Sequence, residues 1–303
     1  MSALSSKRLI FISGKGGVGK SSIAAALALC TSQAKANTLL LELHSQNRMA
    51  CLLGHPTSCE EPTLAEPHLW TANLQFQSAL KEYALLVLKY EPIYRVVFEN
   101  RWTQQLLHFI PSLQELVLLG KLLHHAREKT PEGQFRFDKI IVDAPPTGHL
   151  TRLLSIPSVL LRTVPPGTLA QDAQWMEALL QAPTTAALLV SLPAEMAVQE
   201  TLELHHALTT EARIEVAALL LNRTVPALFS AAELEHPALA NQPALLQLAR
   251  RQEALAKASA SAFLQLAGLG VPAFQLPCVS FEKPTRHAIV RLASHMKETE
   301  GLL

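Results

Sequence analysis

The feature that most constrains this chain is a glycine-rich loop near its start. Residues 14–21 read GKGGVGKS, which matches the pattern G-x-x-x-x-G-K-[ST]. The preceding residues, 8–13, are apolar and predict a buried strand, and residues 21–31 are rich in Ala and Leu and predict a helix. In this setting, backbone N–H groups and a helix N-terminus bind phosphate groups. The sequence therefore predicts a nucleotide-binding α/β fold.

The residues of this loop divide the work of binding a nucleotide. Lys20 is expected to reach the β- and γ-phosphates of ATP, and the Ser21 hydroxyl is expected to ligate Mg²⁺. Asp143 ends the apolar run FDKIIVD, and a P-loop enzyme needs such a carboxylate to hold the metal or its water. We therefore expect ATP or ADP with Mg²⁺, the metal being held by Ser21 and Asp143. The loop residues expected to contact the nucleotide are Gly14, Lys15, Gly16, Gly17, Val18, Gly19, Lys20, Ser21 and Ser22.

Short apolar runs recur along the chain, separated by helix-compatible sequence. This alternation is typical of a doubly wound, mostly parallel sheet. Two segments, approximately 77–130 and 226–268, have helical spacing instead and predict an inserted helical subdomain. We expect residues 1–303 to form a single domain of this kind, with residues 58–68 as a flexible loop. The further strands are expected at 37–43, 137–143, 185–192, 216–222 and 272–277.

The composition narrows the range of partners. A net charge of +1 gives no reason to expect a nucleic acid. No apolar stretch reaches the roughly 18 residues needed for an integral membrane segment. The four cysteines are scattered without a C-x-x-C pair, and the N-terminus lacks a secretory layout. We therefore expect a cytoplasmic protein with reduced cysteines and no thiolate metal site.

Several motifs together resemble the ParA/MinD/ArsA group of P-loop ATPases. KGGVGKSS (15–22) resembles the deviant Walker A loop of that group. DAPPTGHLTRLLSIP (143–157) resembles the D-T-A-P-T-G-H motif of one branch, which contains the arsenite-efflux ATPase ArsA and the cytosolic ATPase that targets tail-anchored membrane proteins. Residues 110–122, 191–204 and 218–223 resemble further segments of this branch, so the resemblance covers most of the chain.

The resemblance implies roles that the composition does not. In this group the first lysine of the loop reaches the phosphates bound by the other subunit, so Lys15 would act like an arginine finger in a homodimer. A heterodimer with a paralogous ATPase remains open. Asn222 and Arg223 would lie at the adenine, and His149 would relay the nucleotide state to the helices.

The same resemblance implies an ATPase whose nucleotide state controls binding and release of a client protein, such as a hydrophobic membrane-protein helix. Two alternatives remain open. One is a nucleotide-binding scaffold or regulator with little or no hydrolysis. The other is a positioning ATPase similar to ParA or MinD.

The chain departs from the group in the loop after its second strand. The group reads S-T-D-P-A-H there, and its Asp positions the attacking water. An alignment without gaps places Glu42 at the Ser position and His44 at the Asp position. His44 has a pKa near neutrality but would tend to be protonated beside polyphosphate, whereas Glu42 is a carboxylate on the same face of the strand. The base is therefore Glu42, His44 or neither residue, with Lys15 and Asp143 as the other expected catalytic residues, and ATP binding is predicted more firmly than hydrolysis.

Overall fold

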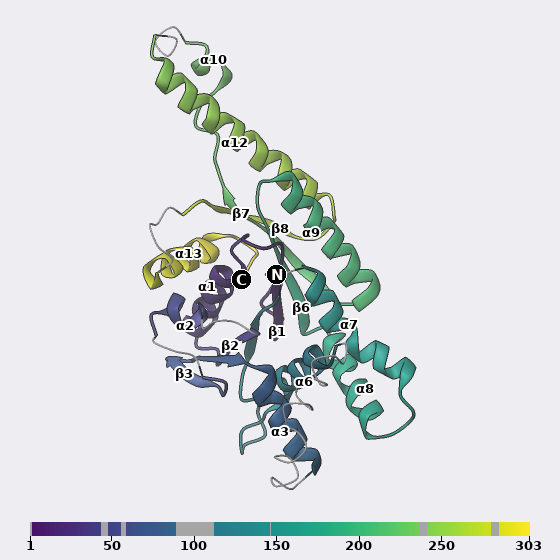
Figure 1. Cartoon of the computed structure of the whole chain (residues 1–303). Coiled ribbons are helices and arrows are strands. Elements are labelled where there is room, and N and C mark those ends of the chain that lie inside the picture. Colours follow the sequence, from purple (N-terminus) through teal and green to yellow (C-terminus); the bar gives the residue numbers. More distant parts are fainter. Residues whose placement is uncertain are drawn as a thin grey trace.

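The computed structural model describes residues 2–43, 48–55, 59–88, 112–145, 147–236, 241–279 and 285–303. In these residues the chain forms one eight-stranded sheet (Figure 1). The strands are β1 (Leu9–Ser13), β2 (Thr38–Leu43), β3 (Thr63–Glu66), β4 (Leu69–Leu74), β5 (Lys139–Asp143), β6 (Thr185–Ser191), β7 (Val216–Thr224) and β8 (Ala273–Pro277).

The order of the strands across the sheet is β3-β4-β2-β5-β1-β6-β7-β8. Neighbouring strands are parallel except β3 and β4, which are antiparallel. Chain order therefore reverses on either side of β1, and the carboxyl ends of the central strands meet at one edge. This arrangement confirms the α/β fold with a doubly wound, mostly parallel sheet.

Helices cover both faces of this sheet. Side chains along β1 alternate between the two layers: Leu9 and Phe11 join one apolar core, and Ile10 and Ile12 join the other. The first core takes in α6 (Leu113–Arg127), α7 (Thr147–Thr163), α8 (Thr168–Leu180), α9 (Glu195–Ala207), the π-helix η1 (Leu208–Ala212) and the end of α12 (Pro243–Ala267). The second takes in α1 (Lys20–Gln33), α2 (Arg48–Leu53) and α13 (Arg286–Glu298).

Burial on both faces explains why the central strands read as continuous apolar runs. Every residue of β1 and β6 is buried. The six strands expected from the sequence are present as β1, β2, β5, β6, β7 and β8. The expectation of a loop across 58–68 is wrong for residues 63–66, which form β3. The side chains of β3 are exposed or half-buried, and the strand is held by pairing with β4. Strand β4, which is largely buried, was not expected either.

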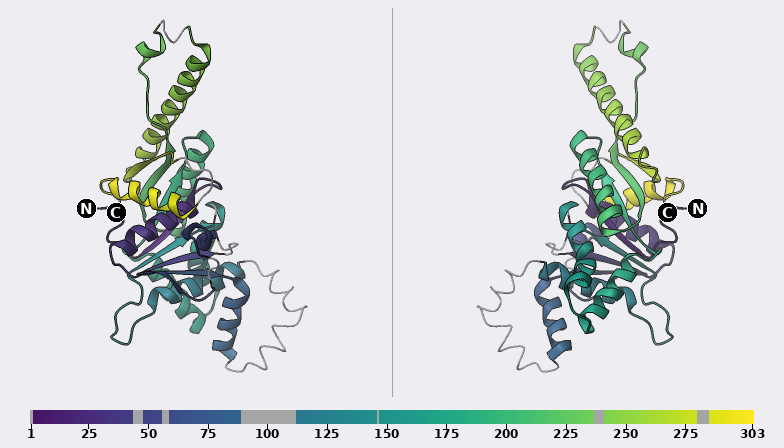
Figure 2. Two further views of the ribbon diagram at one scale, coloured as in Figure 1. Left: turned by 90° about the vertical axis from the view of Figure 1, so that its left-hand side faces the viewer. Right: turned by 90° about the vertical axis from the view of Figure 1, so that its right-hand side faces the viewer.

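The two helical segments expected from the sequence lie at opposite ends of the sheet. Helix α3 (Phe76–Leu88) packs on α6 near β4, whereas α12 and the short α10 (Ala231–Leu234) extend beyond β7 as an arm (Figures 1 and 2). Residues 89–111 and 237–240 lie outside the described residues. Treatment of the chain as one domain stays a prediction. Across the described helices, none is long and apolar enough to cross a membrane.

Candidate nucleotide-binding site

The glycine-rich loop joins β1 to α1 under tight steric limits. Gly14 has a φ of 151°, and a Cβ there would lie 2.1 Å from the carbonyl oxygen of Val190 in β6. Gly19 has a φ of 101°, and its Cβ would lie 2.6 Å from Nδ2 of Asn222. At Gly16, by contrast, a Cβ would meet nothing within 4 Å. The loop is thus fixed at both ends by close approach and open in the middle, where phosphate groups fit.

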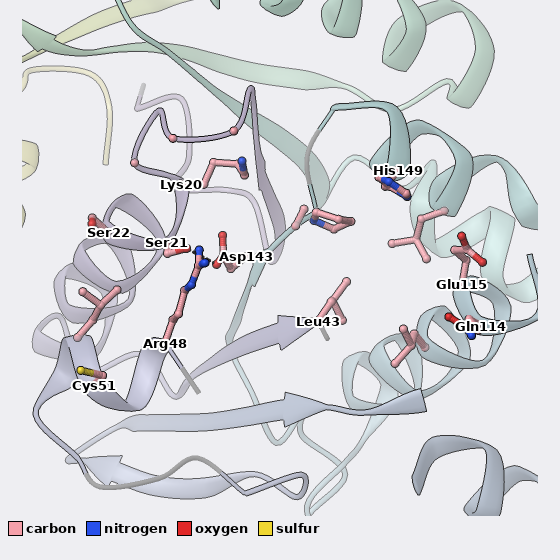
Figure 3. A pocket seen from close by; sticks show the side chains of 18 residues that line it. Lys20, Ser21, Ser22, Leu43, Arg48, Cys51, Gln114, Glu115, Asp143 and His149 are labelled. Carbon is pink, nitrogen blue, oxygen red and sulfur yellow. Dashed lines mark hydrogen bonds between the residues drawn. The ribbon is translucent and has the colours of Figure 1, made fainter. Parts of the chain in front are cut away.

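A cavity of about 1070 Å³ opens in front of the loop (Figure 3). The loop and the start of α1 form one wall, including Gly17 and Ser22. The ends of β2 and β5 and the first turns of α2 form the floor, and α6 and α7 face the loop with Glu115 and His149. The structure therefore brings together Lys20, Ser21, Ser22 and Asp143 as expected, with His149 on the opposite wall.

A hydrogen bond joins the start of α1 to the end of β5. The Ser21 hydroxyl donates to Oδ2 of Asp143 at 2.6 Å, while Oδ1 of Asp143 is buried without a hydrogen-bond partner. Burial raises the pKa of Asp143 to about 6, and the Glu42 carboxylate adds to this rise, against the opposing effects of Ser21 and Lys20.

A hydroxyl beside a buried carboxylate oxygen that lacks a partner is a donor set that suits a hard cation such as Mg²⁺. Ser21 and Asp143 therefore fit the metal expected from the sequence. A bound Mg²⁺ supplies positive charge that offsets charge on phosphate oxygens. With Mg²⁺ bound, the Asp143 carboxylate would be favoured in its ionised form, which burial alone disfavours.

Lys20, the first residue of α1, curls back over the loop. Its Nζ donates to the carbonyl oxygens of Gly14 at 3.0 Å and Lys15 at 2.9 Å. Burial lowers the pKa of Lys20, and the nearby Asp143 carboxylate opposes that change. The ammonium group is therefore held at the phosphate-binding surface by backbone oxygens that phosphate oxygens can replace.

Lys15 is engaged within its own chain. Its Nζ lies 2.6 Å from Oε1 of Glu200 in α9, and the two side chains are 28% and 33% exposed. The sequence reasoning missed Glu200. The available signal was its position within residues 191–204, a segment that resembles the ArsA branch. The role of Lys15 in a second subunit stays a prediction.

Glu42 lies directly beside Asp143 in the sheet. The two residues are register partners in the parallel pair β2–β5, and Glu42 is 1% exposed. Two carboxylates therefore sit side by side at the end of the central strands. His44 lies outside the described residues. Arg48, which sequence reasoning missed, also lines the cavity floor.

Asn222, in β7, holds the glycine loop through a hydrogen bond. Its Nδ2 donates to the carbonyl oxygen of Val18 at 2.8 Å, and its Oδ1 accepts from the backbone N–H of Arg223 at 2.9 Å. The Val18 side chain is itself fully buried in the core. Arg223 is exposed and has a φ of 58°. These contacts give Asn222 a bracing role, and contact of Asn222 and Arg223 with adenine stays a prediction.

Comparison with known proteins agrees with this geometry. Residues 7–166 match the ArsA ATPase family, described as anion-transporting ATPases, and this range includes the loop, Asp143 and His149. The chain belongs to the ArsA ATPase family. The family resemblance inferred from the sequence motifs is thereby confirmed.

Individual relatives of this ArsA-family chain are named as ATPases. It is 29% identical over 231 residues to the ATPase BagA of Mycobacterium tuberculosis, covering 75% of this chain and 68% of BagA. It is 29% identical over 269 residues to the arsenical pump-driving ATPase of Acidiphilium multivorum, covering 82% of this chain and 43% of that protein. It is 25% identical over 151 residues to the ATPase ASNA1 homolog of Dictyostelium discoideum, covering 50% of this chain and 42% of that protein.

Proposed function

We propose that this ArsA-family chain is a cytoplasmic, Mg²⁺-dependent ATPase that works as a homodimer and uses its nucleotide state to bind and release a hydrophobic protein client. The observation that carries the proposal is the hydrogen bond between Ser21 and Asp143 beside the open glycine loop. It joins the two elements from which a P-loop enzyme holds the metal of Mg·ATP. The relatives named as ATPases support the same reaction.

Each residue then has a role that follows from its place. The N–H groups of the loop and the Lys20 ammonium bind the phosphates, and Ser21 and Asp143 hold the metal. Glu42 positions the attacking water, because it is a buried carboxylate beside Asp143. His44 is the other residue proposed for that task. Asn222 keeps the loop in shape through Val18.

Dimer formation would require Lys15 to exchange one partner for another. The Lys15–Glu200 pair is partly exposed, and such pairs contribute only about 0.2–1 kcal/mol to stability. The triphosphate of a second subunit offers more negative charge than the single Glu200 carboxylate. Lys15 can therefore leave Glu200 at small cost and neutralise charge in the partner site.

Client binding is proposed for the helical segment 77–130. Helices α3 and α6 pack together through Phe76, Ala79 and Val117. The first turns of α6 also line the nucleotide cavity with Gln114 and Glu115. One helix thus belongs both to the nucleotide cavity and to the proposed client-binding segment, which supports coupling between nucleotide state and client.

The second candidate is a nucleotide-binding scaffold with little hydrolysis. The observation that favours it is Glu42, which puts a second buried carboxylate next to Asp143 where the family has a serine. Such a site still binds Mg·ATP, but its turnover depends on whether Glu42 or His44 can act on water.

Single-turnover ATP hydrolysis, measured together with the mass of the protein in solution, tests the proposal. With Mg·ATP we expect a dimer that hydrolyses its bound ATP, and with EDTA a monomer that does not. Tight ATP binding without hydrolysis would favour the scaffold. Failure to bind either ATP or ADP would overturn both readings.

A further inference from the structure

Arg48 occupies a position in the cavity that the proposed ATPase cycle does not yet use. It is the first residue of α2, shortly after the carboxyl end of β2. Figure 3 shows its side chain rising from α2 with the guanidinium beside Ser21 and Asp143. Among the described residues of the cavity wall, Lys20 and Arg48 are the two lysine or arginine side chains. They approach the cavity from different elements.

The backbone of Arg48 is fixed relative to the loop. The residues that follow it, Met49, Leu52 and Leu53, are buried in the core that also contains the apolar side chains of α1. Since α1 begins at Lys20, the helix that supports Arg48 packs on the helix that carries the phosphate-binding lysine. A change in the distance between the backbones of Lys20 and Arg48 therefore requires repacking of this core.

The positive charge of Arg48 affects the pKa values of two neighbouring groups in the cavity, Lys20 and Asp143. Burial lowers the pKa of Lys20 and raises that of Asp143; the Arg48 charge adds to the lowering at Lys20 and opposes the rise at Asp143. A guanidinium this close to Ser21 and Asp143 lies on the metal side of the site, opposite the glycine loop. The inner phosphates fit within the loop, so the terminal phosphate would extend toward this side.

We propose that Arg48 binds the terminal phosphate of ATP from within the same chain and thereby makes the site distinguish ATP from ADP. The inference rests on the proposed function, because it needs a nucleotide in this cavity. The planar fork of N–H donors in a guanidinium matches pairs of phosphate oxygens better than an ammonium does. Arg48 and Lys20 would then hold the triphosphate from two sides, with Asp143 as the balancing carboxylate.

Equilibrium binding of ATP and of ADP to the full chain, by titration calorimetry, tests this assignment. For Arg48→Ala we expect ATP affinity to fall about 10- to 100-fold and ADP affinity to change less than about threefold. Arg48→Lys should lie between wild type and Arg48→Ala for ATP. The matched control is Arg250→Ala, which removes an exposed arginine from α12 and should leave both affinities unchanged.

Repeating the titrations with EDTA separates a direct phosphate contact from an effect on the metal. A selective loss of ATP affinity that persists without Mg²⁺ supports the direct contact. Equal losses for ATP and ADP, or none, would overturn the assignment and leave Arg48 as a structural partner of the cavity carboxylates. Thermal unfolding of each variant shows whether the fold is kept, and Arg48→Lys remains informative if Arg48→Ala unfolds. Failure of wild type to bind either nucleotide would instead overturn the proposed function.

Discussion

The two walls of the nucleotide cavity that meet at Asp143 are built in different ways. The loop wall is held by backbone contacts, with Gly14 against Val190 and Val18 bonded to Asn222. The β2–α2 wall carries charged side chains instead: Arg48 lines the cavity, and Glu42 is buried beside Asp143. A loop that binds phosphate through backbone N–H groups must keep its backbone conformation, so few substitutions are allowed there. A wall that binds ligands through side chains can change its chemistry by substitution without a change of fold. Glu42, which departs from the family pattern, belongs to β2 and so to this second wall.

The largest effect is expected for Gly14→Ala. Its Cβ would overlap the Val190 carbonyl oxygen at a positive φ, so the loop must shift. We expect nucleotide binding to be lost and the free energy of unfolding to fall by roughly 3 kcal/mol. The control is Gly16→Ala, where a Cβ meets open space and unfolding should change by less than about 1 kcal/mol. Equal stability of both variants in thermal unfolding without nucleotide would contradict the claim that backbone contacts fix this wall.

Substitution of the two carboxylates, Asp143 and Glu42, should distinguish metal binding from activation of water. Asp143→Asn removes the proposed metal ligand, so we expect kcat to fall on the order of 100-fold or more, with a weaker dependence on Mg²⁺. Glu42→Gln should lower kcat by about 100-fold if this residue positions the attacking water, with little change in ATP affinity. A Glu42→Gln variant with wild-type kcat would exclude Glu42 as the base and leave His44 or a partner group.

The stability of the nucleotide-free protein should depend on pH through Asp143. Its pKa of about 6 in the folded chain exceeds its ordinary value of 3.8. The folded chain therefore binds this proton more tightly, and the resulting stability is full below the unfolded pKa and is lost as pH rises through about 6. We expect the free energy of unfolding to be higher at about pH 5 than at about pH 8, by on the order of 1 kcal/mol, relative to Asp143→Asn.

Denaturant unfolding of both proteins at the two pH values measures this difference, because other titrating groups are common to the pair. An identical pH dependence in wild type and Asp143→Asn would mean that the Asp143 carboxyl is not held away from solvent. Saturating Mg·ATP should reduce the effect, since the metal favours the ionised carboxylate.

The smallest effect on stability is expected at the Lys15–Glu200 pair. Both side chains are partly exposed, so Glu200→Ala should change the free energy of unfolding by less than about 1 kcal/mol. It should nevertheless increase the fraction of dimer with Mg·ATP, because Lys15 is released. Glu203→Ala on the same helix is the matched control, since in the described part of the chain the Glu203 carboxylate accepts a hydrogen bond from Gln199 of its own helix. A lower dimer fraction in Glu200→Ala, measured by light scattering, would instead give Glu200 a place in the dimer contact.

Local patterns made the loop wall predictable from the sequence. The strand, glycine loop and helix around Lys20 are contiguous, and Asp143 follows an apolar run. Glu200 lies 185 residues from Lys15, and their contact arises because β6, which precedes α9, pairs with β1, which precedes the loop. Arg48 carries no motif of its own, and its importance follows from the burial of α2. Strand β3 was missed because an edge strand with exposed side chains lacks the apolar run of a central strand. Strand β4 is largely buried, but Thr71 and Asn73 interrupt its apolar run.

The packing of α13 on α1 has a consequence for synthesis of the chain. Leu292 and Met296 of α13 help to bury α1, and Leu4 pairs through its backbone with Leu302. A nascent chain presents the glycine loop long before residues 286–298 leave the ribosome. Until then the side of α1 that packs on α13 has no cover, and contacts between distant parts of a sequence form late. Fragments that stop before α13 are therefore expected to bind chaperones and not to bind nucleotide.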